Sequence, residues 1–465
     1  MFRWFFHFLC SLTFSFNLSG QSDVVIIQKI HLIGNIKTNP EVLLRELDFA
    51  ERDSLLLNKL AIIFDENEKR LLSTGLFTTV DINIRFYHDN TRDADVLISV
   101  KEGWYLYPYP IFELADRNFN VWAKDFNYSL QRLNYGVAMT HINVTGHKDI
   151  LKIKAQFGFT GKYELFYDFP YLKNGWGASI NLLYAYNKEI SYKTLNNRPV
   201  FFKAPDERNL LNQTRIYMAV QNRKNAFTFH TFKIQYFQGN TDPFIPETLN
   251  KDYFLNGSTE LTFFRFEYDF VVNRLLYPLY PESGYLWRIN FKKDGFGESK
   301  QMNITQLSGE FENHWTMNAD FIFSTRLHAK ANLQRNKVPY FFNQALGYEN
   351  NEVTGYQLYV IDGTDYCYLK NSLKFRIFKK NFHFDKWVPQ KFIPFSTQVF
   401  LRFNVDGGFV HEPFFYQENH LANSFLLGYG PGLDMVFFHN MVLSCDFSLN
   451  KQGEAGFFFS GGFQF

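Results

Sequence analysis

Hydrophobic and polar residues alternate along several stretches in the C-terminal three-quarters of the chain. The clearest are 150–159, 325–334, 367–377 and 399–406. An alternation with a period of two predicts a strand with one apolar face and one polar face. Strands of about ten residues are long enough to cross a membrane when tilted, and a spanning barrel turns its apolar faces outward.

This pattern predicts an all-β transmembrane barrel over residues 105–465. About 350 residues, at roughly 22 per strand and connection, give about 16 antiparallel strands, an even number as in single-chain bacterial barrels. Unpaired backbone groups are costly in hydrocarbon, so we expect the last strand to pair with the first. A soluble β-sandwich is the alternative, but a strand region of this length is large for one sandwich.

The segment 21–104 has a different pattern and predicts one small α/β domain. An apolar strand-like run is followed by two helix-like segments and then by two alternating strands, in the order βααββ. The predicted elements are a strand over 25–33, a short helix ending near Leu47, a helix from about Asn58 to Ser73, and strands through 80–86 and 96–100.

The start of the first helix carries a strong signal. Asn39 suits the cap position and Pro40 suits the first helical position. Thr38 and Glu41 have the spacing of a capping box, in which each side chain bonds a backbone N–H of the other. We therefore expect the helix to begin at Pro40.

The first twenty residues are typical of a secretory signal peptide. Arg3 gives a basic start, a short apolar core follows, and Ser19 and Gly20 precede the polar Gln21. A membrane anchor is the alternative interpretation, for which the apolar stretch is short. We expect cleavage after Gly20 and export of the mature chain.

Composition narrows the classes of protein further. Aromatic residues make up 19% of the chain, with 56 Phe, 27 Tyr and 7 Trp, which excludes a disordered chain. Apolar runs of about 20 residues do not occur after the first twenty positions, which excludes a bundle of membrane helices. The net charge of +2 excludes a typical nucleic-acid-binding domain.

Motifs for catalysis or metal binding are not found. The 12 His residues lack metal-ligand spacing, and the chain has 3 Cys residues, too few for a disulfide framework. Cys10 lies in the predicted signal peptide, while Cys367 and Cys445 fall on the lipid-facing alternation of different strands. We expect these two thiols to face lipid, with a disulfide as the less favoured alternative, and we expect no enzyme activity, cofactor or metal.

The polar faces of the predicted strands carry charges that would line the barrel lumen. Solvated walls whose charges pair with one another are the simpler interpretation, and guidance of a passing chain or solute is the alternative. The residues are Arg265, Glu267, Asp269, Arg288, Lys292, Glu310, Glu312, Arg326, Lys330, Lys370, Lys374, Arg376, Arg402 and Asp406.

Several motifs, in their order along the chain, resemble the outer-membrane β-barrel assembly and bacterial surface antigen superfamily, in a short form with one POTRA domain. Segment 21–104 resembles a POTRA domain through its element order, and segment 428–465 resembles the last three barrel strands. The carrying motifs are Gly34-Asn35; Gly75-Leu76-Phe77; the Pro-x-x-Gly turn through Pro281 and Gly284; Val353-Thr354-Gly355-Tyr356; and Asp406-Gly407-Gly408.

The resemblance implies specific roles for some of these residues. The motif that begins at Val353 would lie on a long loop folded into the lumen, but Thr354 replaces the family's Arg and lacks its charge and planar fork. We expect Arg402 and Asp406, both facing the lumen, to pair in part with each other instead. The last strand would be a C-terminal barrel signal through Phe457, Phe459, Phe463 and Phe465.

The resemblance also implies a location and a function. The barrel would lie in the bacterial outer membrane with the POTRA domain in the periplasm, in contact with lipids, unfolded client polypeptides and accessory lipoproteins. A POTRA strand edge would receive the client, and the seam between the first and last strands would act as a template for insertion or translocation. A passive pore or solute channel and a surface-exposed structural protein are the alternatives.

Overall fold

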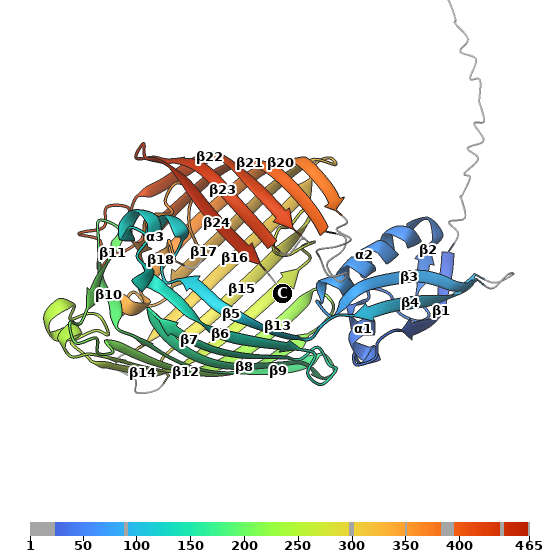
Figure 1. Ribbon diagram of the computed structural model, residues 1–465, viewed down its shortest axis with the longest axis horizontal. Coiled ribbons are helices and arrows are strands. Elements are labelled where there is room, and N and C mark those ends of the chain that lie inside the picture. Colours follow the sequence, from blue (N-terminus) through green and yellow to red (C-terminus); the bar gives the residue numbers. More distant parts are fainter. Residues whose placement is uncertain are drawn as a thin grey trace, which may run out of the picture.

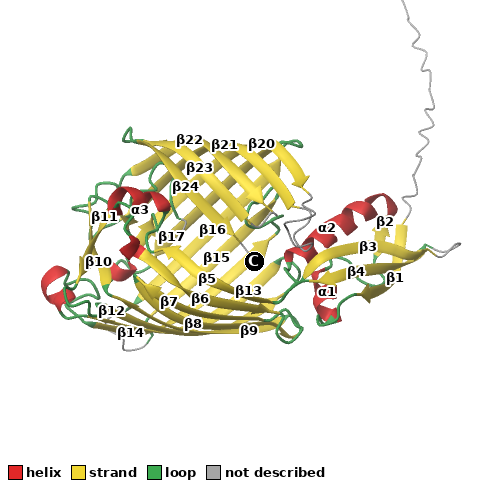
Figure 2. Cartoon of the chain, in the orientation of Figure 1, coloured by secondary structure: helices red, strands yellow, loops and turns green. Residues whose placement is uncertain are grey.

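The computed structural model describes residues 24–87, 92–296, 302–348, 351–382, 395–437 and 441–463. A small α/β domain is followed by a sixteen-stranded sheet that curves into a barrel (Figure 1). Helices belong to the small domain and to the loops at the opposite end of the barrel (Figure 2). The predicted signal peptide lies outside the described residues.

The N-terminal domain adds one short strand to the predicted order. Its sheet has the strand order β2-β1-β4-β3, with β1 and β4 parallel and the other pairs antiparallel. The long strand β3 therefore lies at one edge of the sheet and the three-residue β2 at the other. The elements are β1 Val24–Ile33, α1 Pro40–Glu46, β2 Ser54–Leu56, α2 Leu60–Ser73, β3 Phe77–Tyr87 and β4 Asp93–Glu102.

Helix α1 begins at Pro40, as predicted. The Asn39 side chain accepts a hydrogen bond from the Glu41 N–H at 3.0 Å. The capping-box prediction is wrong, because the Thr38 hydroxyl bonds the Tyr105 hydroxyl at 3.0 Å instead. Thr38 thus ties the start of the helix to the chain that leads into the barrel.

A compact hydrophobic core holds this domain together. Both helices pack their apolar sides on the sheet, with Leu43, Leu71 and Ile98 fully buried. Gly34 ends β1 with φ +93°, and a Cβ at this position would lie 1.9 Å from the Val100 carbonyl oxygen. Only glycine fits there, since it alone adopts this conformation without steric cost.

The barrel consists of sixteen strands, each antiparallel to its neighbours, which confirms the predicted strand number. Their order in the sheet follows the chain, so each pair is a hairpin or is joined by a longer loop. The strands are β5 Leu106–Leu114, β6 Leu133–Ile142, β7 Ile150–Gly158, β8 Thr160–Lys173, β9 Trp176–Asn187, β12 Leu211–Arg223, β13 Thr228–Thr241, β14 Glu260–Asn273, β15 Gly284–Asp294, β16 Ile304–Thr316, β17 Phe321–Asn332, β20 Asp365–Phe382, β21 Phe395–His411, β22 Phe425–Phe437, β23 Met441–Asn450 and β24 Ala455–Phe463.

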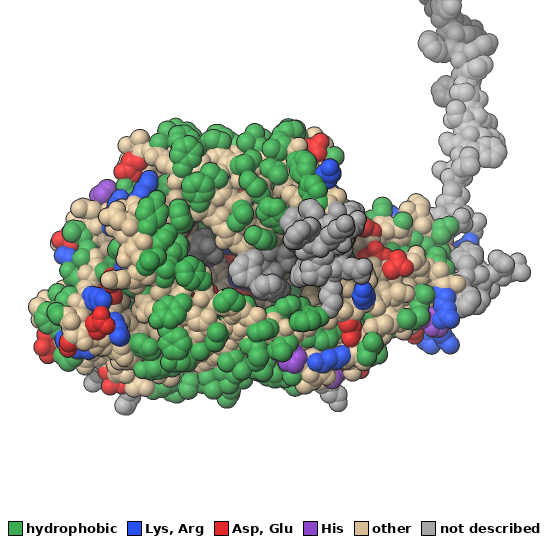
Figure 3. All heavy atoms as spheres, viewed as in Figure 1, with side chains coloured by type: hydrophobic (Ala, Val, Ile, Leu, Met, Phe, Trp, Pro, Cys, Tyr) green, Lys and Arg blue, Asp and Glu red, His purple; other side chains and the backbone are tan. Residues whose placement is uncertain are grey.

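The predicted alternation is visible in side-chain exposure. On β20, Leu373 and Phe375 are 43% and 36% exposed, whereas Lys374 between them is 6% exposed. Hydrophobic side chains spread over the visible outer wall of the barrel (Figure 3). Cys367 on β20 and Cys445 on β23 are free thiols, separated in the sheet by two other strands.

Loops between the strands carry the remaining elements. The barrel end next to the N-terminal domain is called the near end here, and the opposite end the far end (Figure 1). No helix in the described ranges is long and apolar enough to cross a membrane. The far-end elements are α3 Phe119–Phe126, the hairpin β10 Glu189–Leu195 and β11 Arg198–Lys203, and the pair β18 Gln344–Leu346 and β19 Ile361–Asp362; short helical turns cover Leu57–Lys59, Leu130–Arg132, Ile245–Leu249 and Tyr340–Phe342.

Candidate functional site

The barrel sheet has two edge strands, which are its first strand, β5, and its last strand, β24. Within the described residues, β24 pairs with β23 and β5 pairs with β6, but β24 and β5 do not pair with each other. The two strands face each other across a gap between the ribbons in Figure 1. The expectation that the last strand pairs with the first is therefore wrong for this structure.

Strand β5 contains a physical reason for the open seam. Pro108 and Pro110 lie in β5, and proline has no backbone N–H to donate to a neighbouring strand. Because the two prolines are two residues apart, their nitrogens point to the same side. The ladder with β6 runs from Leu106 to Leu114 without a shift in register, so we assign the missing donors to the open side.

Helix α3, in the loop between β5 and β6, lies against the free edge of β24. The buried Asn120 side chain donates to the Phe457 carbonyl oxygen at 3.1 Å and accepts from the Phe459 N–H at 3.2 Å, in the amide orientation that satisfies both partners. The Phe119 and Phe459 rings pack edge to face, with centroids 6.2 Å apart. A side-chain amide thus occupies backbone groups that a neighbouring strand would otherwise bond.

The segment before α3 is anchored to the long loop between β17 and β20, called the lumen loop here (residues 333–364). The Arg117 guanidinium donates to the carbonyl oxygens of Leu358 at 2.8 Å and Tyr359 at 2.6 Å. Asn118 caps α3 and also donates to the Gln357 carbonyl oxygen at 2.7 Å. Helix α3 therefore bridges the lumen loop and the edge of β24.

The motif residues Val353 to Tyr356 lie on the lumen loop and are buried against β20, β21 and β22. The Thr354 hydroxyl donates to the Asp406 carboxylate at 2.6 Å, and the Thr354 N–H donates to the same oxygen at 3.1 Å. Thr354 therefore fixes the loop to the barrel wall through a short hydroxyl contact in place of a guanidinium.

The rest of the motif binds the far ends of the last strands. The Gly355 carbonyl oxygen accepts from Asn450 at 3.1 Å, and the Tyr356 hydroxyl donates to Gln452 at 2.6 Å. Gly355 has φ +82°, and a Cβ there would lie 2.8 Å from the Leu449 carbonyl oxygen. The lumen loop thus contacts the hairpin that leads into β24.

Arg402 and Asp406 face the lumen, as predicted, but they do not pair with each other. Arg402 bonds Asp446 at 2.7 Å and Asp434 at 3.3 Å, whereas Asp406 lies 3.8 Å from Lys370 and also binds the lumen loop. Two carboxylates on neighbouring strands hold the guanidinium, so it is not available to Asp406.

The Pro-x-x-Gly turn between β14 and β15 reaches into the near end of the lumen. Its Tyr280 is buried, packs on Phe400 with ring centroids 5.0 Å apart, and donates to Asp434 at 2.7 Å. Glu282 from the same turn accepts from Arg376 at 2.7 Å. The turn therefore connects β14 and β15 to strands further along the sheet.

Most of the predicted lumen charges have charged partners, as the simpler interpretation expected. All but one of the following pairs join neighbouring strands; Arg376–Glu282 joins β20 to the turn before β15. The pairs are Arg265–Asp294, Lys233–Glu267, Arg288–Asp269, Arg288–Glu310, Arg326–Glu310 and Arg376–Glu282.

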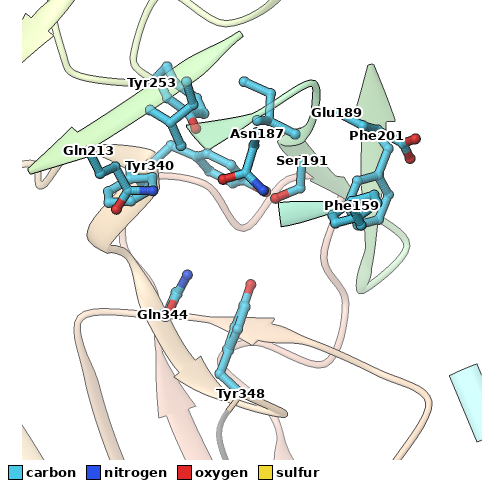
Figure 4. A pocket seen from close by; sticks show the side chains of 13 residues that line it. Phe159, Asn187, Glu189, Ser191, Phe201, Gln213, Tyr253, Tyr340, Gln344 and Tyr348 are labelled. Atoms are coloured by element: carbon cyan, nitrogen blue, oxygen red, sulfur yellow. The ribbon is translucent and has the colours of Figure 1, made fainter. Parts of the chain in front are cut away.

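The far half of the barrel contains two hydrophobic clusters. One includes Phe237, Tyr253 and Phe254 from β13 and the loop that follows it, and the other surrounds the lumen loop. Between these parts lies a cavity of about 190 Å³ lined by aromatic and amide side chains, among them Tyr340 and Tyr348 (Figure 4). A second cavity of about 170 Å³ lies between α3, the lumen loop and β24.

The N-terminal domain docks on the near-end turns of the barrel through Glu46. This α1 carboxylate accepts from Arg223 at 2.6 Å, from Tyr171 at 2.8 Å and from Lys148 at 3.1 Å. Burial alone would raise the pKa of Glu46, but Lys148 and Arg223 hold it well below its ordinary value. Glu46 is therefore charged in the docked domain.

The remaining predicted site residues lie at the ends of elements in the N-terminal domain and along β24. Gly34-Asn35 follows β1, and Gly75-Leu76-Phe77 joins α2 to β3. Phe457 and Phe459 point outward from β24 and are 61% and 49% exposed. Phe463 is the last residue of β24, and Phe465 lies outside the described residues.

Sequence reasoning missed Asn120, Glu46 and the proline pair in β5. The prolines carried a readable signal, because proline in a strand pattern indicates an edge. Asn120 and Glu46 carried none, since their roles depend on partners far away in the chain.

Comparisons with known proteins agree with this architecture. Residues 25–103 match the POTRA family model, described as a surface antigen variable number repeat, which confirms the predicted POTRA domain. No curated protein sequence matches the chain significantly.

Solved structures show the same fold at low sequence identity. CdiB from Escherichia coli aligns with a TM-score of 0.56 and 14% identity, over 94% of this chain and 75% of that chain. BamA from Haemophilus ducreyi lacking POTRA domains 1-3 aligns with a TM-score of 0.51 and 13% identity, over 94% and 84%. CdiB from Acinetobacter baumannii gives 0.50 and 12%, over 94% and 73%.

Fold and domain order thus define the class of protein. The chain is a POTRA-domain β-barrel protein with the fold of BamA and CdiB. The apolar outer wall is the surface expected of a barrel that spans a membrane.

Proposed function

We propose that this protein inserts other polypeptides into the outer membrane, or translocates them across it, at the seam between β5 and β24. The observation that carries the proposal is the unpaired edge of β24. A strand edge presents a row of backbone donors and acceptors that an extended segment can bond, largely independently of its sequence. Pairing on this edge would let a client strand enter lipid without exposed backbone groups.

The POTRA domain supports this proposal as the receiving site. Strand β3, with eleven residues, lies at an edge of the domain sheet, next to the near end of the barrel, which we place in the periplasm. An extended client segment can add to this edge by β-augmentation. The exposed helices leave room for accessory lipoproteins, which we propose as further partners of the domain.

A passive pore is supported less well. Two hydrophobic clusters lie in the far half of the barrel, and the turn with Tyr280 occupies part of the near end. A solute channel needs a continuous polar path and has no use for a strand-receiving domain. A purely structural surface protein would likewise need no open strand edge.

Depletion of the protein, followed by an inventory of outer-membrane proteins, tests the proposal. We expect a defined set of barrels or surface proteins to be lost from the membrane while their transcripts persist. An unchanged inventory together with altered solute permeability would instead support the pore.

A further inference from the structure

Helix α3 covers the strand edge that the proposed function requires to be open. Its contacts with β24 are made by three residues on one stretch of the helix. Phe119 packs on the Phe459 ring, Asn120 bonds the β24 backbone, and the Lys124 ammonium lies 5.7 Å from the centroid of the Phe458 ring. These contacts concentrate on the residues Phe457 to Phe459.

The chemistry of Asn120 indicates what this edge binds. Its carboxamide is the side-chain group closest to a peptide unit, with one carbonyl acceptor and N–H donors on the same planar group. It bonds the Phe457 carbonyl oxygen and the Phe459 N–H, which are successive outward-facing groups of the strand edge. A neighbouring peptide backbone would make the same two kinds of bond.

The two sides of the seam are unequal in this respect. The edge of β5 lacks the N–H groups of Pro108 and Pro110, whereas β24 has no proline among its described residues. An incoming strand therefore finds a fuller set of donors and acceptors on β24. Of the two strand edges at the seam, α3 covers the one with the fuller set of backbone donors and acceptors, the edge of β24.

We propose that α3 is a resident placeholder on β24, and that the surface it covers at Phe457–Phe459 is the docking site for the backbone of an extended client segment. This inference rests on the proposed function and specifies its site. The client strand replaces the Asn120 amide, so α3 must leave β24 before pairing can extend along the edge. The polar cavity between α3, the lumen loop and β24 lies directly behind this contact.

Hydrogen exchange tests whether α3 covers the edge, independently of any client. In the purified full-length protein, Asn120→Ala should speed exchange of the Phe459 amide about five- to tenfold, as expected for loss of one hydrogen bond. Asn134→Ala is the matched control, because the Asn134 side chain bonds the Thr160 N–H, a backbone donor of β8 and not of β24. Unchanged exchange at Phe459 in Asn120→Ala would contradict the placeholder.

A crosslink tests whether α3 must leave. Phe119→Cys and Phe459→Cys, in a background with Cys367→Ser and Cys445→Ser, can be joined by a short cleavable bismaleimide. Trp287→Cys and Phe311→Cys, whose native rings lie 4.5 Å apart on two neighbouring wall strands, form the control pair. We expect the α3–β24 crosslink to deplete client proteins from the outer membrane, cleavage to restore them, and the control crosslink to have no effect.

The outcomes separate the inference from the proposed function. If depletion alters the outer-membrane inventory but the α3–β24 crosslink does not, the inference is wrong and the proposed function stands. If depletion itself leaves the inventory unchanged, the proposed function fails and the docking site fails with it.

Discussion

The Thr354 hydroxyl donates a 2.6 Å hydrogen bond to the Asp406 carboxylate, which fixes the lumen loop to β21. The shared acceptor also bonds the Thr354 N–H, so the carboxylate holds both the side chain and the backbone of the loop. The loop is thus held without the guanidinium that the resemblance implies for this position. A threonine side chain is shorter than an arginine side chain. The contact between Thr354 and Asp406 therefore requires the backbones of the lumen loop and of β21 to lie close together.

Thr354→Val should loosen the lumen loop. Valine keeps the shape of threonine but removes the hydroxyl, so the buried Asp406 loses one donor at about 1.5–3 kcal/mol. We expect a lower unfolding midpoint in urea and faster cleavage of the loop by added protease. Thr354→Ser retains the hydroxyl and serves as the control. A valine variant as stable and as protected as the native protein would show that this contact does not hold the loop.

Glu46→Gln should release the POTRA domain from the barrel. The substitution leaves the Arg223 guanidinium without its charged partner, and breaking a buried pair in this way costs about 3–5 kcal/mol. Spin labels at Ile62→Cys and Met317→Cys, in the Cys367→Ser and Cys445→Ser background, report the distance between the two parts. We expect a narrow distance distribution that broadens in Glu46→Gln.

Glu41→Gln is the matched control for this experiment, because Glu41 lies exposed on the same helix. It should leave the distance distribution narrow. Equal distributions in the native protein and in Glu46→Gln would show that other contacts hold the domain in place.

The docking should resist mild acid. Docking lowers the pKa of Glu46 from an ordinary value near 4.5, so its contribution is complete above that pH and is lost as the pH falls through the docked pKa. The same spin-label distances should stay constant from pH 8 to about pH 5 and broaden only below about pH 4.5. Broadening between pH 7 and pH 5 would point to a different group as the one that controls docking.

The prolines of β5 should keep the seam open. Pro108→Ala combined with Pro110→Ala restores two N–H donors, which favours pairing of β5 with β24. We expect a more heat-resistant barrel and a weaker supply of client proteins to the outer membrane. Pro199→Ala, in the far-end hairpin, controls for the general effect of removing proline from a strand. Increased client supply in the double variant would contradict this role of the prolines.

The wall of the barrel was predictable from the sequence, and its seam was only partly so. Each strand can be predicted from its own sequence, because hydrophobic and polar residues alternate along it. On β20 this alternation places Leu373 and Phe375 outward and Lys374 inward. Whether the sheet closes depends on two strands more than 300 residues apart, and no local pattern records that pairing. Pro108 and Pro110 did mark β5 as an edge.

The site contacts depended even more on tertiary structure. Arg402 could be placed in the lumen by alternation, but its choice of Asp434 and Asp446 over Asp406 follows from the packing of three neighbouring strands. Asn120 looked like an ordinary loop residue, because its partners are backbone groups near the other end of the chain. The contact between Thr354 and Asp406 could not be predicted either. The short Thr354 side chain can bond Asp406 only where the lumen loop lies close to β21.

Site-specific photocrosslinking can show whether the edge of β24 receives client polypeptides. A photoreactive phenylalanine analogue at Phe459, on the outer wall at the seam, should capture unfolded outer-membrane proteins in growing cells. The same analogue at Phe409, 42% exposed on β21, should capture none of them. Client adducts at Phe459 alone would support docking of clients on β24, and adducts confined to lipid or to β5 of the same molecule would show that clients do not dock there.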